Sequence, residues 1–243
     1  MKSGKMTMTR EDAIRAVLAY DTPSVTNVVA TYGSDKEHCM GLYDPWMDKW
    51  YTDQSLHCIY PELGPRAGYA VTVIYGLPDG NCSGLGFFDV CKAIEASPKP
   101  VVLVIKQDMP ERIKNRCGLC GGNMMTAFKA LGTVGVISDG PCRDIDEVRP
   151  LGMQYMLTGV CAGHGDFGVH AVNTGVEVCG MEVMPGEIIH MDENGAVKFP
   201  ADRLEDVCRL CERMRREESA KQKALSRCTT AEEAMEIVSA TYH

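Results

Sequence analysis

The segment from Gly68 to Asp144 alternates apolar runs with helix-like stretches, and glycine-rich turns separate them. The apolar runs at 70–75, 100–106 and 134–138 predict strands, and the second is typical of a strand buried on both faces. Helices are predicted at 87–96 and 123–131 between them. This alternation predicts an α/β core. Residues 153–200 predict further short strands with tight turns.

Helices are predicted on both sides of this core. Thr9 can cap a helix that runs to about Tyr20, and Thr22 can cap a second that begins with Pro23 and ends near Gly33. A charged helix is expected from Pro200 to about Leu225, and the capping box at 230–233 starts a last short helix. We therefore expect N-terminal helices and a long loop that pack on the body (1–66), an α/β body (67–200) and a C-terminal helical tail (201–243).

Composition excludes several function classes. The 25 basic and 33 acidic residues give a net charge of −8, which disfavours nucleic acid as a partner. No apolar run approaches the ~20 residues that a membrane-spanning helix needs, and the N-terminus lacks the apolar stretch of a secretory signal. We therefore expect a cytoplasmic protein whose 12 cysteines are reduced thiols.

The candidate chemistry lies between Gly121 and Asp146. Gly121 and Gly122 lead into a helix whose first backbone amides can hold an anion. The following strand ends in a turn that delivers Arg143 and Asp144, and both features should meet at one edge of the sheet. The guanidinium would pair with a substrate carboxylate and Asp144 with a divalent metal, a set that suits a 2-oxo acid. The simpler alternative is a tight turn with surface contacts and glycines that serve packing.

Several motifs occur together and in order along this stretch. They are GYAVTV at 68–73, GGNMMTA at 121–127, VISDGPCRDIDE at 136–147, VMPGEII at 183–189 and DENGAV at 192–197, with DTPSVTN at 21–27 as a less specific addition. In this combination the chain resembles the RraA-like family, which includes 4-hydroxy-4-methyl-2-oxoglutarate aldolases. The resemblance implies a three-layer β/β/α swivelling-domain fold that assembles into homotrimers or homohexamers, with active sites between subunits.

The resemblance also implies site residues. Arg143 would bind the pyruvyl carboxylate, Asp144 would reach Mg²⁺ or Mn²⁺, and the amides at the helix start would hold the pyruvyl unit. Those amides lie in the stretch Gly121, Gly122, Asn123 and Met124, and Glu217 is the candidate from a neighbouring subunit. The implied activity is a metal-dependent lyase that cleaves a C–C bond in a 2-oxo acid, as an aldolase or an oxaloacetate decarboxylase. The alternative is a non-catalytic regulator that binds a protein partner.

Two positions depart from the family pattern. In the aldolases an acidic residue precedes the Arg-Asp pair with twenty residues between them. This chain has Gly122 at that position, so an acidic partner for the metal is missing. Lys106 stands at a strand end where family members often have Asp. A desolvated lysine can form a Schiff base with a 2-oxo acid, although a lysine at a strand end is more often solvated.

Other groups admit two interpretations each. The pairs Cys117/Cys120 and Cys208/Cys211 have CxxC spacing, but 87 residues separate the pairs, so packing is favoured over zinc or redox chemistry. His164 and His170 flank Asp166 and could ligate a metal, although loop histidines are more often structural. Trp46 and Trp50 are expected at a subunit interface rather than at a substrate entrance.

Overall fold

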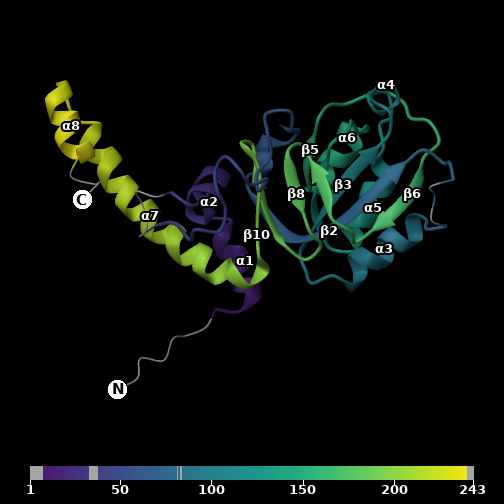
Figure 1. Ribbon diagram of the computed structural model, residues 1–243, viewed down its shortest axis with the longest axis horizontal. Helices are drawn as coiled ribbons and strands as arrows, with labels where there is room; N and C mark the ends of the chain where they lie inside the picture. The colour runs from purple at the N-terminus through teal and green to yellow at the C-terminus, as the bar shows by residue number, and fades with distance from the viewer. Residues whose placement is uncertain (1–7, 33–37, 81, 83, 240–243) are drawn as a thin grey trace, which may run out of the picture. The chain divides into compact units, whose positions relative to one another are not determined.

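The computed structural model describes residues 8–32, 38–80, 82 and 84–239. These residues group into two compact units (Figure 1). One, here called the α/β unit, comprises residues 49–202, and the other, the helical unit, combines the chain before residue 49 with the chain from residue 203 onward. Residues 49–66 therefore group with the α/β body.

The α/β unit is built on one eight-stranded mixed sheet. Its strands are β1 (His57–Cys58), β2 (Arg66–Gly76), β3 (Val101–Asp108), β4 (Thr133–Ser138), β5 (Gln154–Leu157), β6 (Gly168–Val172), β9 (Ile188–Asp192) and β10 (Gly195–Phe199). The order is β1-β5-β4-β3-β2-β9-β10, and β6 also pairs with β2. The strands β2, β3, β4 and β5 run parallel to their neighbours in this set, as the alternation predicts, and the outer pairs are antiparallel.

Strand β3 shows why this sequence needs a layer on each face of the sheet. Val101, Leu103 and Ile105 enter one hydrophobic core, while Val102 and Val104 enter another. Successive side chains of a strand point to opposite faces, so a continuous apolar run is stable only when both faces are covered.

Helices cover one face of the sheet and a β-hairpin covers the other (Figure 1). The first core includes residues of α3 (Phe87–Ala96), α5 (Gly122–Ala130) and α6 (Ile145–Val148). The second includes residues of β7 (Val176–Val178) and β8 (Met181–Val183), which form a separate two-stranded sheet. The result is the predicted α/β fold with β, β and α layers. The short helices α4 (Glu111–Lys114) and α6 have no counterpart among the predicted elements.

The helical unit contains α1 (Arg10–Val17), α2 (Thr22–Val29), α7 (Leu204–Leu225) and α8 (Ala231–Ser239). Thr9 caps α1 through its side chain, as predicted, but Asp21 rather than Thr22 caps α2, because its carboxylate accepts from the Ser24 amide at 2.9 Å. Helix α2 ends at Val29, earlier than predicted, and the backbone is extended at Ala30. The predicted cap residue Gly33 lies outside the described residues.

The predicted capping box of the last helix is confirmed, since the Glu233 amide donates to Thr230 Oγ1 at 3.2 Å. Cys208 and Cys211 are buried in α7, where they pack as small apolar residues. Within the described part of the chain, no helix is long and apolar enough to cross a bilayer.

Candidate functional site

The start of α5 and the turn after β4 lie together at one edge of the sheet, as the sequence predicts. The backbone N–H of Gly122 donates to Asp144 Oδ2 at 3.0 Å. The N–H of Arg143 donates to the carbonyl of Cys120 at 3.1 Å, which ties the two segments together one residue earlier. The first free amide of the helix therefore binds a carboxylate of this chain.

Asp144 has an unusual backbone conformation. Its φ of 59° and ψ of 40° lie in the left-handed region, which few residues other than glycine adopt, although aspartate tolerates it better than most. Strain of this kind persists only where the surrounding contacts fix the residue. Here the contacts are the hydrogen bonds to Gly122 and Arg143, which aim the carboxylate at the start of α5.

Arg143 contacts its neighbour through only one of its nitrogens. Its Nε lies 3.0 Å from Asp144 Oδ1, and the two side chains are 32% and 24% exposed. Within the described residues, the terminal nitrogens of the guanidinium make no hydrogen bond. The end of the guanidinium therefore still offers the two parallel N–H groups that bind a carboxylate bidentately.

Carboxylates closely approach Gly121, the cap of α5, and Gly122, its first residue. A Cβ added at Gly121 would lie 2.3 Å from Asp144 Oδ2, and one added at Gly122 would lie 2.1 Å from Glu147 Oε2. An acidic residue at position 122 would therefore meet the carboxylate that Glu147 already places there. Glu147 is a residue of this site that the sequence analysis did not single out. The sequence signal that could have found it is its position three residues after Asp144, because residues three apart on a helix lie on the same face.

The amides of Asn123 and Met124 belong to the first turn of α5, where a helix leaves N–H groups without intrahelical acceptors. They follow directly on Gly122, whose amide Asp144 already occupies. Their assignment to a pyruvyl group remains a prediction.

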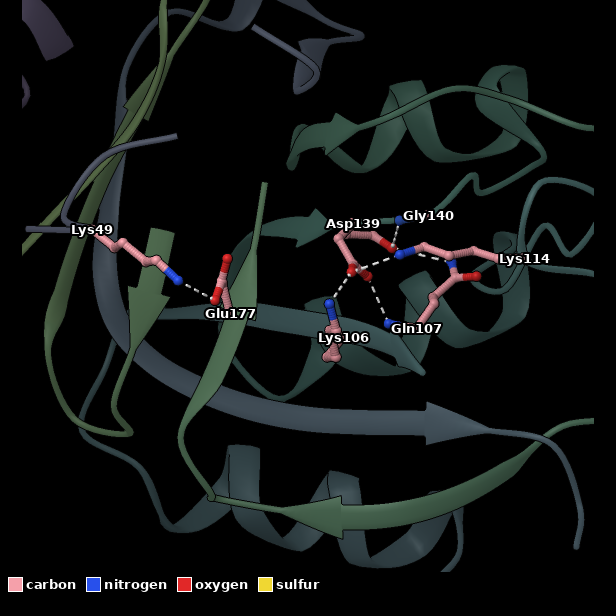
Figure 2. A network of polar contacts seen from close by, with 8 residues as sticks. Lys49, Lys106, Gln107, Lys114, Asp139, Gly140 and Glu177 are labelled. Atoms are coloured by element: carbon pink, nitrogen blue, oxygen red, sulfur yellow. Dashed lines mark hydrogen bonds and ion pairs between the residues drawn. The ribbon is translucent and has the colours of Figure 1, made fainter. Parts of the chain in front are cut away.

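Lys106 is ion-paired. Its Nζ lies 2.7 Å from Asp139 Oδ2, and Lys114 Nζ reaches the same oxygen at 2.7 Å (Figure 2). The other oxygen of Asp139 accepts from the backbone N–H of Gln107 at 2.7 Å. Asp139 is only 7% exposed, so this carboxylate joins the ends of β3 and β4 to α4 in a nearly buried position. Lys106 is a partner in this network rather than a solvated strand tip.

Buried thiols lie behind the Arg143-Asp144 turn. Cys120 and Cys142 are both fully buried, and Tyr155 donates its hydroxyl to the carbonyl of Cys120 at 2.7 Å. A hydrogen bond with Cys142, together with burial, raises the pKa of Cys120, and burial raises the pKa of Cys117. The raised pKa values of Cys117 and Cys120 argue against redox or metal chemistry at this CxxC pair. All twelve cysteines are free in the structure.

The histidines and Glu217 occupy other surroundings. His170 Nε2 lies 2.8 Å from the Leu77 carbonyl, and the ring of His164 packs edge-on to Phe167. The described residues contain no group of three or more His, Cys, Asp or Glu side chains arranged to hold a metal ion. Glu217 lies on α7 in the helical unit, where it pairs with Arg213 at 3.1 Å and with His38, and its role toward a neighbouring subunit remains a prediction.

Comparison with known proteins identifies several relatives. Protein DlpA of Legionella pneumophila is 28% identical over 171 residues, which cover 70% of this chain and 27% of DlpA. A 4-hydroxy-4-methyl-2-oxoglutarate aldolase of Thermus thermophilus is 32% identical over 87 residues, covering 35% of this chain and 52% of the aldolase. The chain thus spans about a quarter to a half of the length of these two relatives.

A solved structure supports the fold. The Streptomyces coelicolor protein RraAS2, described as an unusual member of the RNase ES inhibitor RraA protein family, superposes with a TM-score of 0.65. It is 20% identical in sequence, and the match covers 86% of this chain and 95% of RraAS2. Residues 23–198 match the RraA-like family, described as Aldolase/RraA. Because this match covers well over half of the chain, the protein belongs to the RraA-like family.

Proposed function

We propose that this protein is a lyase that cleaves a C–C bond next to the pyruvyl unit of a 2-oxo acid, with a divalent cation such as Mg²⁺ or Mn²⁺ as cofactor. The observation that carries the proposal is the meeting of Arg143, Asp144 and the start of α5 at one edge of the sheet. A guanidinium and free helix amides bind the oxygens of a 2-oxo acid, and a carboxylate binds its metal ion.

Arg143 is the anchor for the substrate carboxylate, because its terminal nitrogens make no hydrogen bond within the described chain. The amides of Asn123 and Met124 lie beyond Gly122 in the same turn of helix, and they would orient the remaining oxygens of the pyruvyl unit. When C–C cleavage leaves an enolate, these hydrogen-bond donors would stabilise the negative charge on its oxygen.

The oxygen donors at this edge fit a magnesium-type ion. Asp144 and Glu147 both bring carboxylate oxygens to the two glycines at the start of α5. Mg²⁺ is usually held by one or two carboxylates plus water and substrate oxygens, so a larger set of protein ligands is not required. When bound, the ion would act as a Lewis acid that stabilises negative charge on the 2-oxo group.

One observation favours the alternative, a non-catalytic protein that binds a partner. Both oxygens of Asp144 already have donors, Gly122 N–H on one and Arg143 Nε on the other. An ion must compete with these contacts, and position 122 adds no acid of its own. In this alternative Arg143 and Asp144 would only stabilise the turn after β4.

Release of pyruvate distinguishes the two functions. Oxaloacetate and 4-hydroxy-4-methyl-2-oxoglutarate are incubated with the wild-type protein and with Asp144→Asn, each with and without Mg²⁺ or Mn²⁺. A lyase gives metal-dependent pyruvate release that Asp144→Asn abolishes. Absence of turnover from both substrates with either metal would contradict the proposal for them and favour partner binding.

A further inference from the structure

A cavity of about 420 Å³ opens on the α/β unit at residues that the proposed function does not use. One wall is formed by α4 and the residues after it, including Arg112, Arg116 and Cys117. The other wall is the loop that carries His164 and Asp166. The cavity is therefore lined by two guanidiniums and an imidazole, with a single carboxylate.

The two arginines of the lining form no ion pair with any acidic residue that the structure describes. Arg112 and Arg116 are four residues apart and exposed, and neither makes an ion pair within the described part of the chain. By contrast Arg149 pairs with Glu62 and Arg143 with Asp144. Two unpaired guanidiniums that line one hollow of a protein with a net charge of −8 favour an anionic ligand.

The arginine-bearing segment is held in place. Lys114 lies between the two arginines in sequence, and its ammonium is bound by the nearly buried Asp139 (Figure 2). The same Asp139 oxygen also binds Lys106 at the end of β3. The wall of the cavity is thus fixed to the carboxyl edge of the parallel sheet, which makes it a preorganised site rather than a loose surface loop.

The cavity adjoins Arg143. Gly118 follows directly on Cys117, and its N–H donates to the carbonyl of Gly163 at 2.9 Å, which joins the two walls. A Cβ added at Gly118 would lie 3.1 Å from that carbonyl oxygen and 3.2 Å from the Cβ of Arg143. A side chain at position 118 would therefore push the neighbouring atoms apart by a few tenths of an ångström.

We propose that this cavity binds a second anionic group, a carboxylate or a phosphate, at the far end of the acid whose 2-oxo carboxylate is held by Arg143. Arg112 and Arg116 are then the residues that select the substrate, and His164 completes the lining. The inference rests on the proposed function, because it names the kind of substrate that the same site accepts.

Three 2-oxo acids that release pyruvate on aldol cleavage test the inference. They are 4-hydroxy-2-oxopentanoate with an uncharged far end, 4-hydroxy-2-oxoglutarate with a carboxylate, and 2-dehydro-3-deoxy-6-phosphogluconate with a phosphate. In Arg112→Gln/Arg116→Gln we expect kcat/KM for an anionic substrate, relative to the uncharged one, to fall about tenfold or more. The anionic substrate that shows this fall identifies the group as carboxylate or phosphate.

The matched control removes the same charge elsewhere. Lys92 on α3 and Lys129 at the end of α5 line no part of the cavity, so Lys92→Gln/Lys129→Gln should leave the ratio unchanged. An equal loss for charged and uncharged substrates in the arginine variant, or the same loss in the control, overturns the inference.

A binding measurement separates failure of the inference from failure of the proposed function. Titration calorimetry with 2-oxoglutarate and with 2-oxobutanoate needs no turnover. Loss of 2-oxoglutarate affinity in Arg112→Gln/Arg116→Gln, with 2-oxobutanoate affinity retained, supports the cavity even if no lyase activity is found. Wild-type affinity for 2-oxoglutarate in that variant, or the absence of binding to the wild-type protein, overturns it. Loss of both ligands in Arg143→Lys reports on the proposed function alone.

Discussion

Asp144 Oδ2 accepts a hydrogen bond from the backbone N–H of Gly122 at 3.0 Å, so the carboxylate caps the helix that begins there. This contact joins two segments that are 22 residues apart in sequence. It also places Arg143 beside the free amides of α5. The predictions below follow from this arrangement and from its supports.

The first prediction concerns the anchor. Arg143→Lys keeps the positive charge but removes the planar fork that binds a carboxylate bidentately. We expect kcat/KM for pyruvate release to fall roughly 30- to 100-fold, which corresponds to ~2–3 kcal/mol for a hydrogen-bonded charge pair. Steady-state kinetics check this. A lysine variant with wild-type kcat/KM would show that Arg143 does not bind the substrate.

The second prediction concerns position 122. Gly122→Asp adds a Cβ that would lie 2.1 Å from Glu147 Oε2 and places a second negative charge there. Because the atom met is the end of a flexible side chain, we expect a loss of only ~1–2 kcal/mol in unfolding free energy. Glu147→Ala in the same chain should recover most of it. Urea unfolding of the two single variants and the double variant gives the coupling, and additive effects would contradict the close contact.

The third prediction concerns Asp139. Asp139→Asn leaves Lys106 and Lys114 without their shared carboxylate in a nearly buried position. Both lysines can still reach solvent, since their side chains are 33% and 19% exposed, so we expect a loss of ~2–3 kcal/mol rather than more. Denaturant unfolding measures it. Lys106→Met should cost less, because Lys114 still pairs with Asp139, and an equal cost would contradict this account.

The fourth prediction is a dependence on pH. Burial raises the pKa of Tyr60 from 10.0 to about 12, and its hydroxyl donates to the carbonyl of Ile145 in α6. A raised pKa means that the folded protein holds the phenolic proton more tightly than the unfolded chain. The stabilisation is therefore complete below pH 10 and is lost as the pH rises toward 12.

The variant Tyr60→Phe isolates this contribution. We expect its free energy of unfolding to be ~1 kcal/mol lower than the wild type at neutral pH, because the hydrogen bond is lost. The difference should shrink between pH 10 and pH 12. A difference that stays constant across this range would show that Tyr60 does not titrate as described.

The fifth prediction concerns assembly. Trp46 and Met47 are 90% and 82% exposed, an unusual state for two large apolar side chains side by side. If the chain forms the expected trimer or hexamer, Trp46→Ser/Met47→Ser should lower the mass measured by light scattering. Met235→Ser, which replaces another exposed apolar residue, is the control. An unchanged mass for both variants would place the interface elsewhere.

The α/β fold and the meeting of Arg143 with the start of α5 are predictable from the sequence. Each follows from a local pattern. A strand that is apolar on both faces needs a layer on each side, and parallel strands bring their carboxyl ends to one edge of the sheet. The caps show where this reasoning fails. Thr22 and Asp21 are both good caps, and the choice between them depends on which carboxylate or hydroxyl reaches the next free amide.

Only the tertiary structure decides which charged groups meet. Three features depend on how separate segments meet: the approach of Glu147 to Gly122, the sharing of Asp139 by two lysines, and the lack of an ion pair at Arg112 and Arg116 among the described residues. Hydrophobic periodicity and secondary-structure propensity indicate which face of its own helix or strand a residue occupies, but not which distant residues it meets. Charges interact through space, and so the sequence determined the layers and the location of the site, while the fold determined its electrostatics.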